Sequence, residues 1–164
     1  MYKIRIVLDT EKDVIRTILV NNSIHLETLH LTIAKSFGFN GSEMASFYRT
    51  DDKWSQGEEI PLFNMSEAGE GISMQHCFIR KTLPSVGDKL IYVYDFFHMW
   101  TFYVETIEIS QESNENLPKT ILAIGETPEE PPEKNFKADG FEDDLDREFE
   151  DDFESLDSLD FDNY

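Results

Sequence analysis

The stretch that decides the fold is KLIYVYDFFHMWTFYVETIEI, which spans residues 89–109. Residues 89–95 are rich in Ile, Leu, Val and Tyr, and residues 100–109 are rich in aromatic and β-branched side chains, a composition typical of strands. Only residues 96–99 separate the two segments, and so short a connection requires the strands to be antiparallel. The sequence therefore predicts a β-hairpin here.

A second hairpin and one helix are predicted at the start of the chain. Residues 2–8 alternate apolar and polar side chains as a half-buried strand does, and residues 14–20 are a second β-branched segment after a polar turn. Residues 26–37 place their apolar side chains on one face of an amphipathic helix, and Gly38 supplies a left-handed C-terminal stop. This order is a ββα start.

We therefore expect an α+β fold, a mostly antiparallel β-sheet with one main helix packed on a face. Its parts are the ββα start and the C-terminal β-hairpin, followed by an acidic tail. Residues 47–49 and 60–63 are candidates for short additional strands, and residues 75–79 are a weaker candidate.

The chain is strongly acidic, and its charge is uneven. It has 164 residues, of which 34 are Asp or Glu and 14 are Lys or Arg, so its net charge is -20 and its pI is about 4.3. Residues 126–164 contain 17 of the acidic residues and three of the basic ones. This balance argues against direct binding of nucleic acid or of an anionic membrane surface, because both require a basic face.

The change in composition predicts three parts. Residues 1–125 are the α+β domain, residues 126–140 a Pro- and Glu-rich linker, and residues 141–164 an acidic tail that is disordered or a marginal amphipathic helix. No apolar run approaches the roughly 18 residues of a membrane-spanning helix, and the start lacks a signal-peptide core. The single cysteine, Cys77, allows no internal disulfide. We expect a cytoplasmic protein with no cofactor.

Two parts of the sequence resemble the Ri-plasmid ORF-3-like family, whose members are also labelled insertion-element passenger proteins. One is Leu-Glu-Thr-Leu-His at 26–30 with Phe-Gly-Phe at 37–39, and the other is the segment 87–96 that leads to Trp100. In that family a ββα start with a Leu-x-x-Leu-His helix precedes a Tyr-Asp-Phe-Gly-Asp-x-Trp hairpin. The resemblance covers about residues 1–130, and what it implies is mainly the fold.

Three positions depart from the family pattern. The Gly-Asp pair of the hairpin is Phe97-His98 here, and the Trp-Arg pair of the second strand is Ile15-Arg16. The Cys-containing segment after the last strand is matched loosely by residues 121–126, without a cysteine. If the family's site uses these polar groups, this chain has lost or changed its activity. Members of this family are occasionally labelled resolvases. This sequence, however, contains no Ser- or Tyr-recombinase signature and no basic DNA-binding helix.

The hairpin connection is the first candidate site. A carboxylate such as Asp95 near a histidine such as His98 can orient the ring or raise its pKa, which is the minimum for general-base catalysis or half a metal site. The alternative is that Phe96 and Trp100 fill the core, Asp95 caps the turn and His98 faces water. The candidate binding residues are Arg16, His30, Tyr94, Asp95, His98 and Trp100.

Other chemistry has little support in the sequence. The four histidines lack the spacing of zinc ligands, so a site of His30, His98 and Asp95 would have to assemble in space, and we expect no bound metal. Cys77 lies in an apolar stretch, and no Gly-x-Ser-x-Gly elbow is present. We assign no catalytic residue.

The acidic tail carries a periodic apolar pattern. Its apolar residues recur at spacings of 4, 4, 4 and 3, with Asp and Glu between them, as in an amphipathic helix: Phe141, Leu145, Phe149, Phe153 and Leu156. Such a segment can dock on a basic, apolar groove of another protein, or compete as a DNA mimic for a DNA-binding protein. The alternatives are a solubilising tail and one that folds back on its own domain.

These observations predict a protein-interaction module whose acidic aromatic tail binds a basic partner, with the oligomeric state left open. The alternative is an enzyme or metal-binding domain with its site at the hairpin connection, residues 94–100, together with His30 and Arg16.

Overall fold

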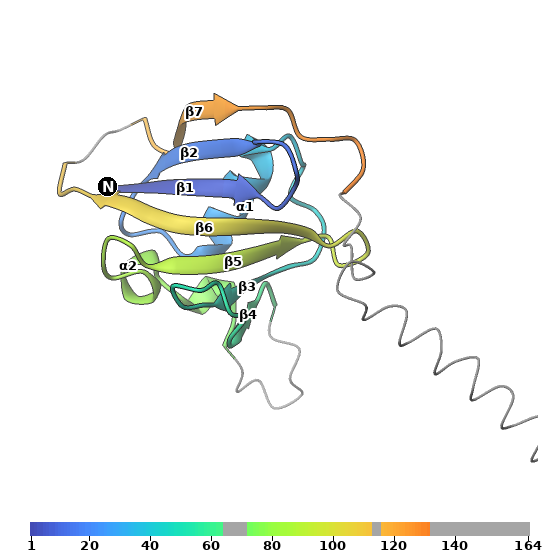
Figure 1. Ribbon diagram of the computed structural model, residues 1–164. Helices are drawn as coiled ribbons and strands as arrows, with labels where there is room; N and C mark the ends of the chain where they lie inside the picture. Colours follow the sequence, from blue (N-terminus) through green and yellow to red (C-terminus); the bar gives the residue numbers. More distant parts are fainter. Residues whose placement is uncertain (64–71, 113–115, 132–164) are drawn as a thin grey trace, which may run out of the picture. The chain divides into compact units, whose positions relative to one another are not determined.

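The computed structural model describes residues 1–63, 72–112 and 116–131 (Figure 1). Within these ranges, seven strands form one antiparallel sheet in the spatial order β4-β3-β5-β6-β1-β2-β7. The strands are β1 (Tyr2–Leu8), β2 (Ile15–Val20), β3 (Ala45–Arg49), β4 (Glu59–Pro61), β5 (Lys89–Tyr94), β6 (Trp100–Ile109) and β7 (Lys119–Ile124). The helical segments are α1 (Leu26–Ser36), the short α2 (Ile79–Thr82) and the 3-10 turn η1 (Met74–His76).

The predicted α+β architecture with one main helix packed on a face is wrong. The fold is mainly a seven-stranded antiparallel sheet, and α1, with 11 residues, is a minor element. The sequence analysis did not predict β7. All six of its residues are exposed, so it lacks the alternation of apolar and polar side chains that marks a half-buried strand. The strand considered at 75–79 is also wrong, because that region forms the end of η1 and the start of α2.

Both predicted hairpins are present. Strand β1 pairs with β2 from Tyr2 opposite Val20 to Val7 opposite Ile15, and β5 pairs with β6 from Lys89 to Tyr94. Strand β6 also pairs with β1, so the two hairpins join into one continuous sheet. The turn that connects β5 and β6 therefore lies at one end of the strands in the middle of the sheet.

The hydrophobic core lies on one face of the sheet. Every second side chain of a central strand points to this face, as for Ile4 and Ile6 of β1, which are fully buried. Phe47, Tyr92 and Phe102 come together from three adjacent strands, with ring centroids 4.9 and 5.5 Å from Tyr92. The helix α1 adds buried side chains to this core: Leu26, Leu29, His30, Ile33 and Ala34. Burial of each large apolar side chain contributes roughly 1.5–3 kcal/mol.

The two edges of the sheet differ from its centre. Strand β4 has only three residues and ends at Pro61, which has no amide hydrogen for a ladder. Strand β7 pairs with β2 in a register that shifts between Thr17 and Ile18, a β-bulge.

Two glycines with positive φ hold turns for different reasons. Gly38 (φ +91°) follows α1, as the sequence predicts, and a Cβ built there would meet nothing within 4 Å. Gly125 (φ +74°) follows β7, and its Cβ would lie 2.1 Å from the carbonyl oxygen of Asp13. A side chain at 125 would therefore push β7 away from the β1–β2 turn.

We expect the replacement Gly125→Ala to lower the free energy of unfolding more than Gly38→Ala does. Gly38→Ala incurs only the cost of a left-handed alanine, about 1 kcal/mol. Gly125→Ala adds a backbone collision, for a total of about 2–3 kcal/mol. Urea denaturation followed by tryptophan fluorescence measures both losses, and equal losses would show that β7 yields without cost.

Candidate functional site

Asp95 organises the turn between β5 and β6. Its Oδ2 lies 2.6 Å from Nδ1 of His98, and its Oδ1 accepts a hydrogen bond from the amide of Phe97 at 3.2 Å. The amide of Met99 donates to the Asp95 carbonyl at 2.6 Å. Asp95 and Met99 both have positive φ, 61° and 55°. One carboxylate therefore fixes a tight, unusual turn and orients the His98 ring, which combines both predicted roles of Asp95.

A pocket of about 440 Å³ opens beside this turn. Its acidic side chains come from three separate segments: Glu43, Asp95, Glu129 and Glu130. His98 also lines it, whereas its lining residues include no Lys, Arg, Ser, Thr or Cys. The pocket therefore has a strongly negative character and no obvious nucleophile.

Aromatic side chains form the other wall of the pocket. The Phe39 ring lies with its centroid 5.0 Å from those of both Tyr94 and Trp100. Tyr94 and Trp100 are buried, and the Tyr94 hydroxyl donates to the Asn40 side chain at 3.2 Å and accepts from the Glu43 amide at 3.4 Å. The structure thus brings four predicted site residues together, since Tyr94, Asp95, His98 and Trp100 all line this pocket.

Three large apolar side chains of the same turn face solvent. Phe97 is 89% exposed, Phe96 41% and Met99 40%. One interpretation of the sequence expected Phe96 and Trp100 to fill the core. Trp100 is buried there, whereas Phe96 is partly exposed. The exposure of Phe97 could not be read from the sequence, because an apolar residue between two strands is equally compatible with burial.

Arg16 lies outside the lining of this pocket. Its side chain is buried, donates from Nε to the Ser36 carbonyl at 2.8 Å and from Nη1 to the carbonyls of Ile15 and Ile124, and lies 4.9 Å from the Phe37 ring centre. Burial lowers the pKa of its guanidinium group. Its role is structural: it joins β2 to the end of α1 and to the end of β7.

We call the hydrogen bonds of Arg16 to these carbonyls the Arg16 clamp. The segment after β7 leads from this clamp to the pocket. The Thr127 hydroxyl donates to the Phe37 carbonyl at 2.8 Å. Glu129, Glu130 and Pro131 then follow along the pocket wall. Residues 124–131 therefore run from the Ile124 carbonyl that Arg16 binds to the wall of the pocket.

His30 also lies away from the pocket, in the core. Its Nδ1 is 2.5 Å from the Tyr92 hydroxyl, and the side chain is 1% exposed. Burial lowers the pKa of His30 to about 4, against the smaller opposite effect of a hydrogen bond with the Gly41 backbone. A neutral, enclosed histidine of this kind is a core residue. A shared site of His30, His98 and Asp95 is therefore not assembled.

Within the described ranges, no three His, Cys, Asp or Glu side chains are grouped so that they could hold a metal ion. Cys77 is buried, and burial raises the pKa of its thiol. In the same part of the chain, no helix has both the length and the apolar character needed to cross a membrane. The candidate tail residues Phe141, Leu145, Phe149, Phe153 and Leu156 lie outside the described residues.

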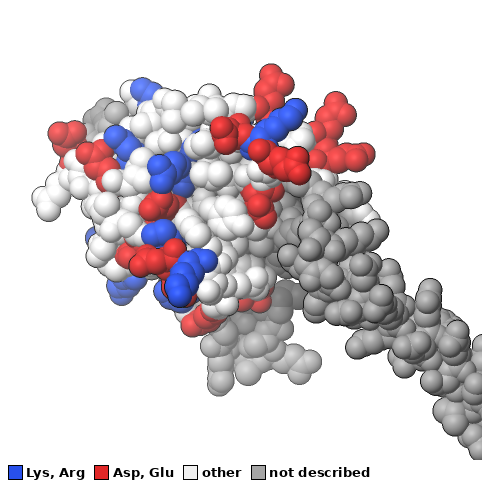
Figure 2. Space-filling model, in the orientation of Figure 1, with Lys and Arg blue, Asp and Glu red and all other residues white. Residues whose placement is uncertain are grey.

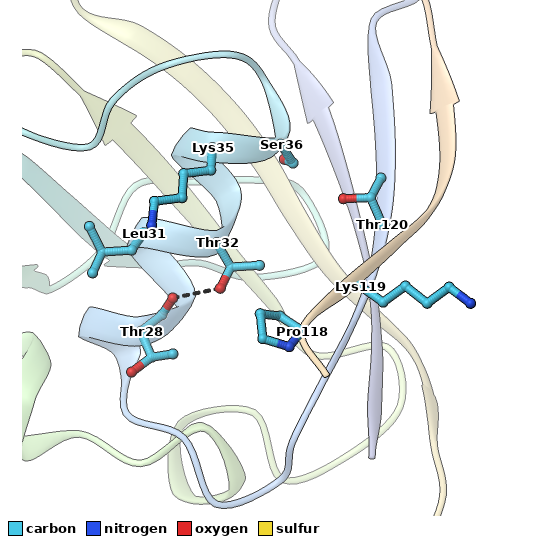
Figure 3. A pocket seen from close by; sticks show the side chains of 8 residues that line it. All are labelled: Thr28, Leu31, Thr32, Lys35, Ser36, Pro118, Lys119 and Thr120. Atoms are coloured by element: carbon cyan, nitrogen blue, oxygen red, sulfur yellow. Dashed lines mark hydrogen bonds between the residues drawn. The ribbon is translucent and has the colours of Figure 1, made fainter. Parts of the chain in front are cut away.

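A second pocket, of about 370 Å³, lies between α1 and β7 (Figure 3). Two of its hydroxyl groups are engaged by the helix itself: Thr32 donates to the Thr28 carbonyl at 2.8 Å (Figure 3), and Ser36 donates to that of Ile33 at 2.7 Å. The side chain of Lys119 extends away from α1. The groups around this pocket do not converge on a ligand position.

The comparisons with known proteins place the chain in a family. A family model described as plasmid pRiA4b ORF-3-like protein matches residues 1–155. The chain belongs to this family. The resemblance noted in the sequence is therefore confirmed, and it extends further along the chain than the hairpin and helix motifs alone.

A solved structure has a similar fold. The crystal structure of a protein of unknown function, MM3350 from Methanosarcina mazei Go1, aligns with a TM-score of 0.60 and 16% identity, over 74% of this chain and 68% of that one. At this identity the similarity concerns the fold alone. The comparison with curated proteins gave no match.

The buried His30 predicts a loss of stability in acid. In the unfolded chain its pKa is near 6.5 and in the folded chain about 4, so the unfolded state takes up the proton first. The stabilisation is complete above about pH 6.5 and is lost as the pH falls toward 4, by about 3 kcal/mol in total.

The measurement is urea denaturation at several pH values between 7 and 4, for the wild type and for His30→Gln. Carboxylates titrate equally in both proteins, so the difference between the two curves isolates His30. We expect this difference to shrink as the pH falls. A constant difference would show that the pKa of His30 is the same in the folded and the unfolded chain.

Proposed function

We propose that this protein is an interaction module that binds a basic protein partner. Two parts would make the contact: the tip surface, defined as Phe96, Phe97 and Met99 with the neighbouring acidic pocket, and the acidic aromatic tail. The observation that carries the proposal is the exposure of Phe97, at 89%, directly beside a pocket lined by four carboxylates.

The apolar half of the tip surface supports a protein partner. Phe96, Phe97 and Met99 lie together in one turn that the hydrogen bonds of Asp95 constrain, and all three are exposed to solvent. Contiguous exposed apolar groups with a polar rim are typical of protein-binding sites, and aromatic anchors supply much of their binding energy. A rigid turn also loses little conformational entropy on binding.

The acidic half supports a basic partner. Glu43, Glu129 and Glu130 have no Lys or Arg beside them in the pocket lining, so a partner's cation would be their counter-charge. Phe39 and the edge of Trp100 add aromatic surface, against which an Arg or Lys side chain packs favourably. The net charge of -20 would accelerate the approach of such a partner.

The tail supports the same class of partner by its sequence. Residues 141–164 combine acidic side chains with periodic Phe and Leu, which matches a basic, apolar groove. Two linked contacts on one partner raise the overall affinity above that of either contact.

An enzymatic function is the second candidate, because the 2.6 Å contact between Asp95 and His98 resembles an oriented general base. The pocket lining includes no Ser, Thr or Cys, so such a base would have to activate water. The binding function needs no further group and is the one we favour.

The first test is Phe97→Ser in the full chain. Partners are captured from a lysate, identified by mass spectrometry, and the basic partner is then titrated calorimetrically. Because Phe97 would be an anchor, its loss should weaken binding by about 30-fold. Phe63→Ser is the matched control, since Phe63 is 55% exposed and does not line the pocket. Equal affinity of both variants with wild type would remove the tip surface from the proposal.

The second test replaces Phe149 and Phe153 of the tail by Ser, which leaves its charge unchanged. If the apolar stripe docks on the partner, affinity falls while its salt dependence stays that of the wild type. Unchanged affinity would mean that the tail contributes charge alone. The domain contact and the tail contact are thereby tested separately.

A further inference from the structure

The loop that joins α1 to β3 forms one wall of the acidic pocket. Gly38, Phe39, Asn40 and Glu43 of this loop all line the pocket. We call residues 37–44 the wall loop. These residues belong to neither a helix nor a strand, so bonds to neighbouring elements decide where the wall stands.

Both ends of the wall loop are held by backbone hydrogen bonds. The amide of Phe39 donates to the Ala34 carbonyl at 2.9 Å, and the Met44 carbonyl accepts from the Asp95 amide at 2.7 Å. Residues 40–43 lie between these two points. Two buried side chains, one from α1 and one from β5, reach this middle part.

His30 of α1 is the first of these side chains. Its ring makes a hydrogen bond with the Gly41 backbone, and its Nδ1 lies 2.5 Å from the Tyr92 hydroxyl. The Gly41 bond acts to raise the pKa of His30, so the backbone group is an acceptor, the carbonyl oxygen, and the ring donates to it. In a neutral imidazole the second nitrogen is an acceptor, so the Tyr92 hydroxyl donates to Nδ1. Tyr92 thereby orients the ring, and the ring holds the loop.

The backbone packs tightly at the residue that His30 bonds. Gly41 has a φ of +80°, and a Cβ built there would lie 2.9 Å from Cδ2 of Leu31 on α1. The loop thus runs directly against α1 at Gly41. A hydrogen bond and close packing therefore fix the same point of the wall.

Tyr94 of β5 is the second side chain. Its hydroxyl donates to the Asn40 side chain at 3.2 Å and accepts from the Glu43 amide at 3.4 Å. Its ring centre lies 6.1 Å from that of His30, so the two anchors are neighbours in the core. Both side chains are almost fully buried, and polar bonds so shielded from water are strong.

The pocket depends on where the wall loop lies. Phe39 covers Trp100, with ring centroids 5.0 Å apart, and Glu43 supplies one of the four carboxylates of the lining. On the sheet face away from α1, Lys and Arg side chains lie among Asp and Glu side chains (Figure 2), whereas no Lys or Arg lines the pocket. A shift of the wall would therefore change both the aromatic lining and the unbalanced negative charge of the pocket.

We propose that His30 is the positioning residue of the acidic pocket: it holds the wall loop, and with it the Glu43 carboxylate, in place. His30 itself touches no bound partner, because it lies in the core. The proposal deepens the proposed function, on which it rests in taking this pocket as part of the binding surface. Its test needs no partner.

Amide hydrogen exchange of the full chain, followed by NMR, tests the proposal. The informative amides are those of Ser42, bonded to the Asn40 side chain at 3.0 Å, and of Glu43. In His30→Leu, which keeps the site apolar, both should lose protection about tenfold relative to the amides of β1 and β6. Tyr92→Phe removes only the hydroxyl that orients the ring, and it should give the same pattern with a smaller loss.

Ile33→Ala is the matched control. Ile33 is a fully buried residue of α1 that does not line the pocket. Its truncation destabilises the core as a whole, so the protection of the wall loop should fall no more than that of the strands. This control separates a local role of His30 from a loss of stability.

The fluorescence of Trp100 reports on the same wall. The chain has two tryptophans, so Trp54→Phe leaves Trp100 as the only emitter. Added to this background, His30→Leu should raise the quenching of Trp100 by acrylamide several-fold, because Phe39 no longer covers the indole. Ile33→Ala should leave the quenching unchanged.

Wild-type protection of the Ser42 and Glu43 amides in folded His30→Leu would overturn the proposal, because the wall loop would then keep its place without the ring. An equal loss of protection in the wall loop and the strands would overturn it too, since that is an effect on global stability alone. Failure to capture any basic partner counts against the proposed function and leaves these exchange rates as they are. The two failures are therefore distinguishable.

Discussion

A single buried guanidinium group ties the periphery of this sheet to its centre. Arg16 donates to carbonyl groups of β2, of the last residue of α1 and of the last residue of β7, and it covers the Phe37 ring. No carboxylate takes part in these bonds, so the cation is satisfied by backbone dipoles, including those at the negative end of a helix. Without it, three carbonyl groups would lose a partner together, and the end of β7 would lose its bond to the centre of the sheet.

The path from Arg16 to the acidic pocket is short. Ile124 is fixed by Arg16, Gly125 lies against Asp13, and Thr127 is bonded to Phe37. Glu129 and Glu130 are the next charged residues, and they line the same pocket as Asp95 and His98. The acidity of the pocket therefore depends on a segment that sequence analysis interpreted as the beginning of a linker.

Sequence reasoning succeeded where one local pattern decided the outcome. The alternation in residues 2–8 and the dense β-branched and aromatic content of residues 89–109 gave both hairpins, because short connections leave antiparallel pairing as the sole solution. It failed for β7, whose exposed residues carry no burial pattern, and it overrated the helix. Asp95, His98, Tyr94 and Trp100 could be grouped from the sequence because one hairpin connects them, and all four line the same pocket. Glu43, Glu129 and Glu130 join them only through long-range packing, which no spacing in the sequence records.

The two edges of the sheet decide how far association can proceed. A long, regular edge strand is a template on which further copies can add without limit. Here one edge is the three-residue β4 that ends at Pro61, and the other is interrupted by the bulge in its pairing with β2. Both ends of the sheet are therefore poor templates. An acidic protein with exposed Ile and Leu on an edge strand is in this way protected from fibre growth.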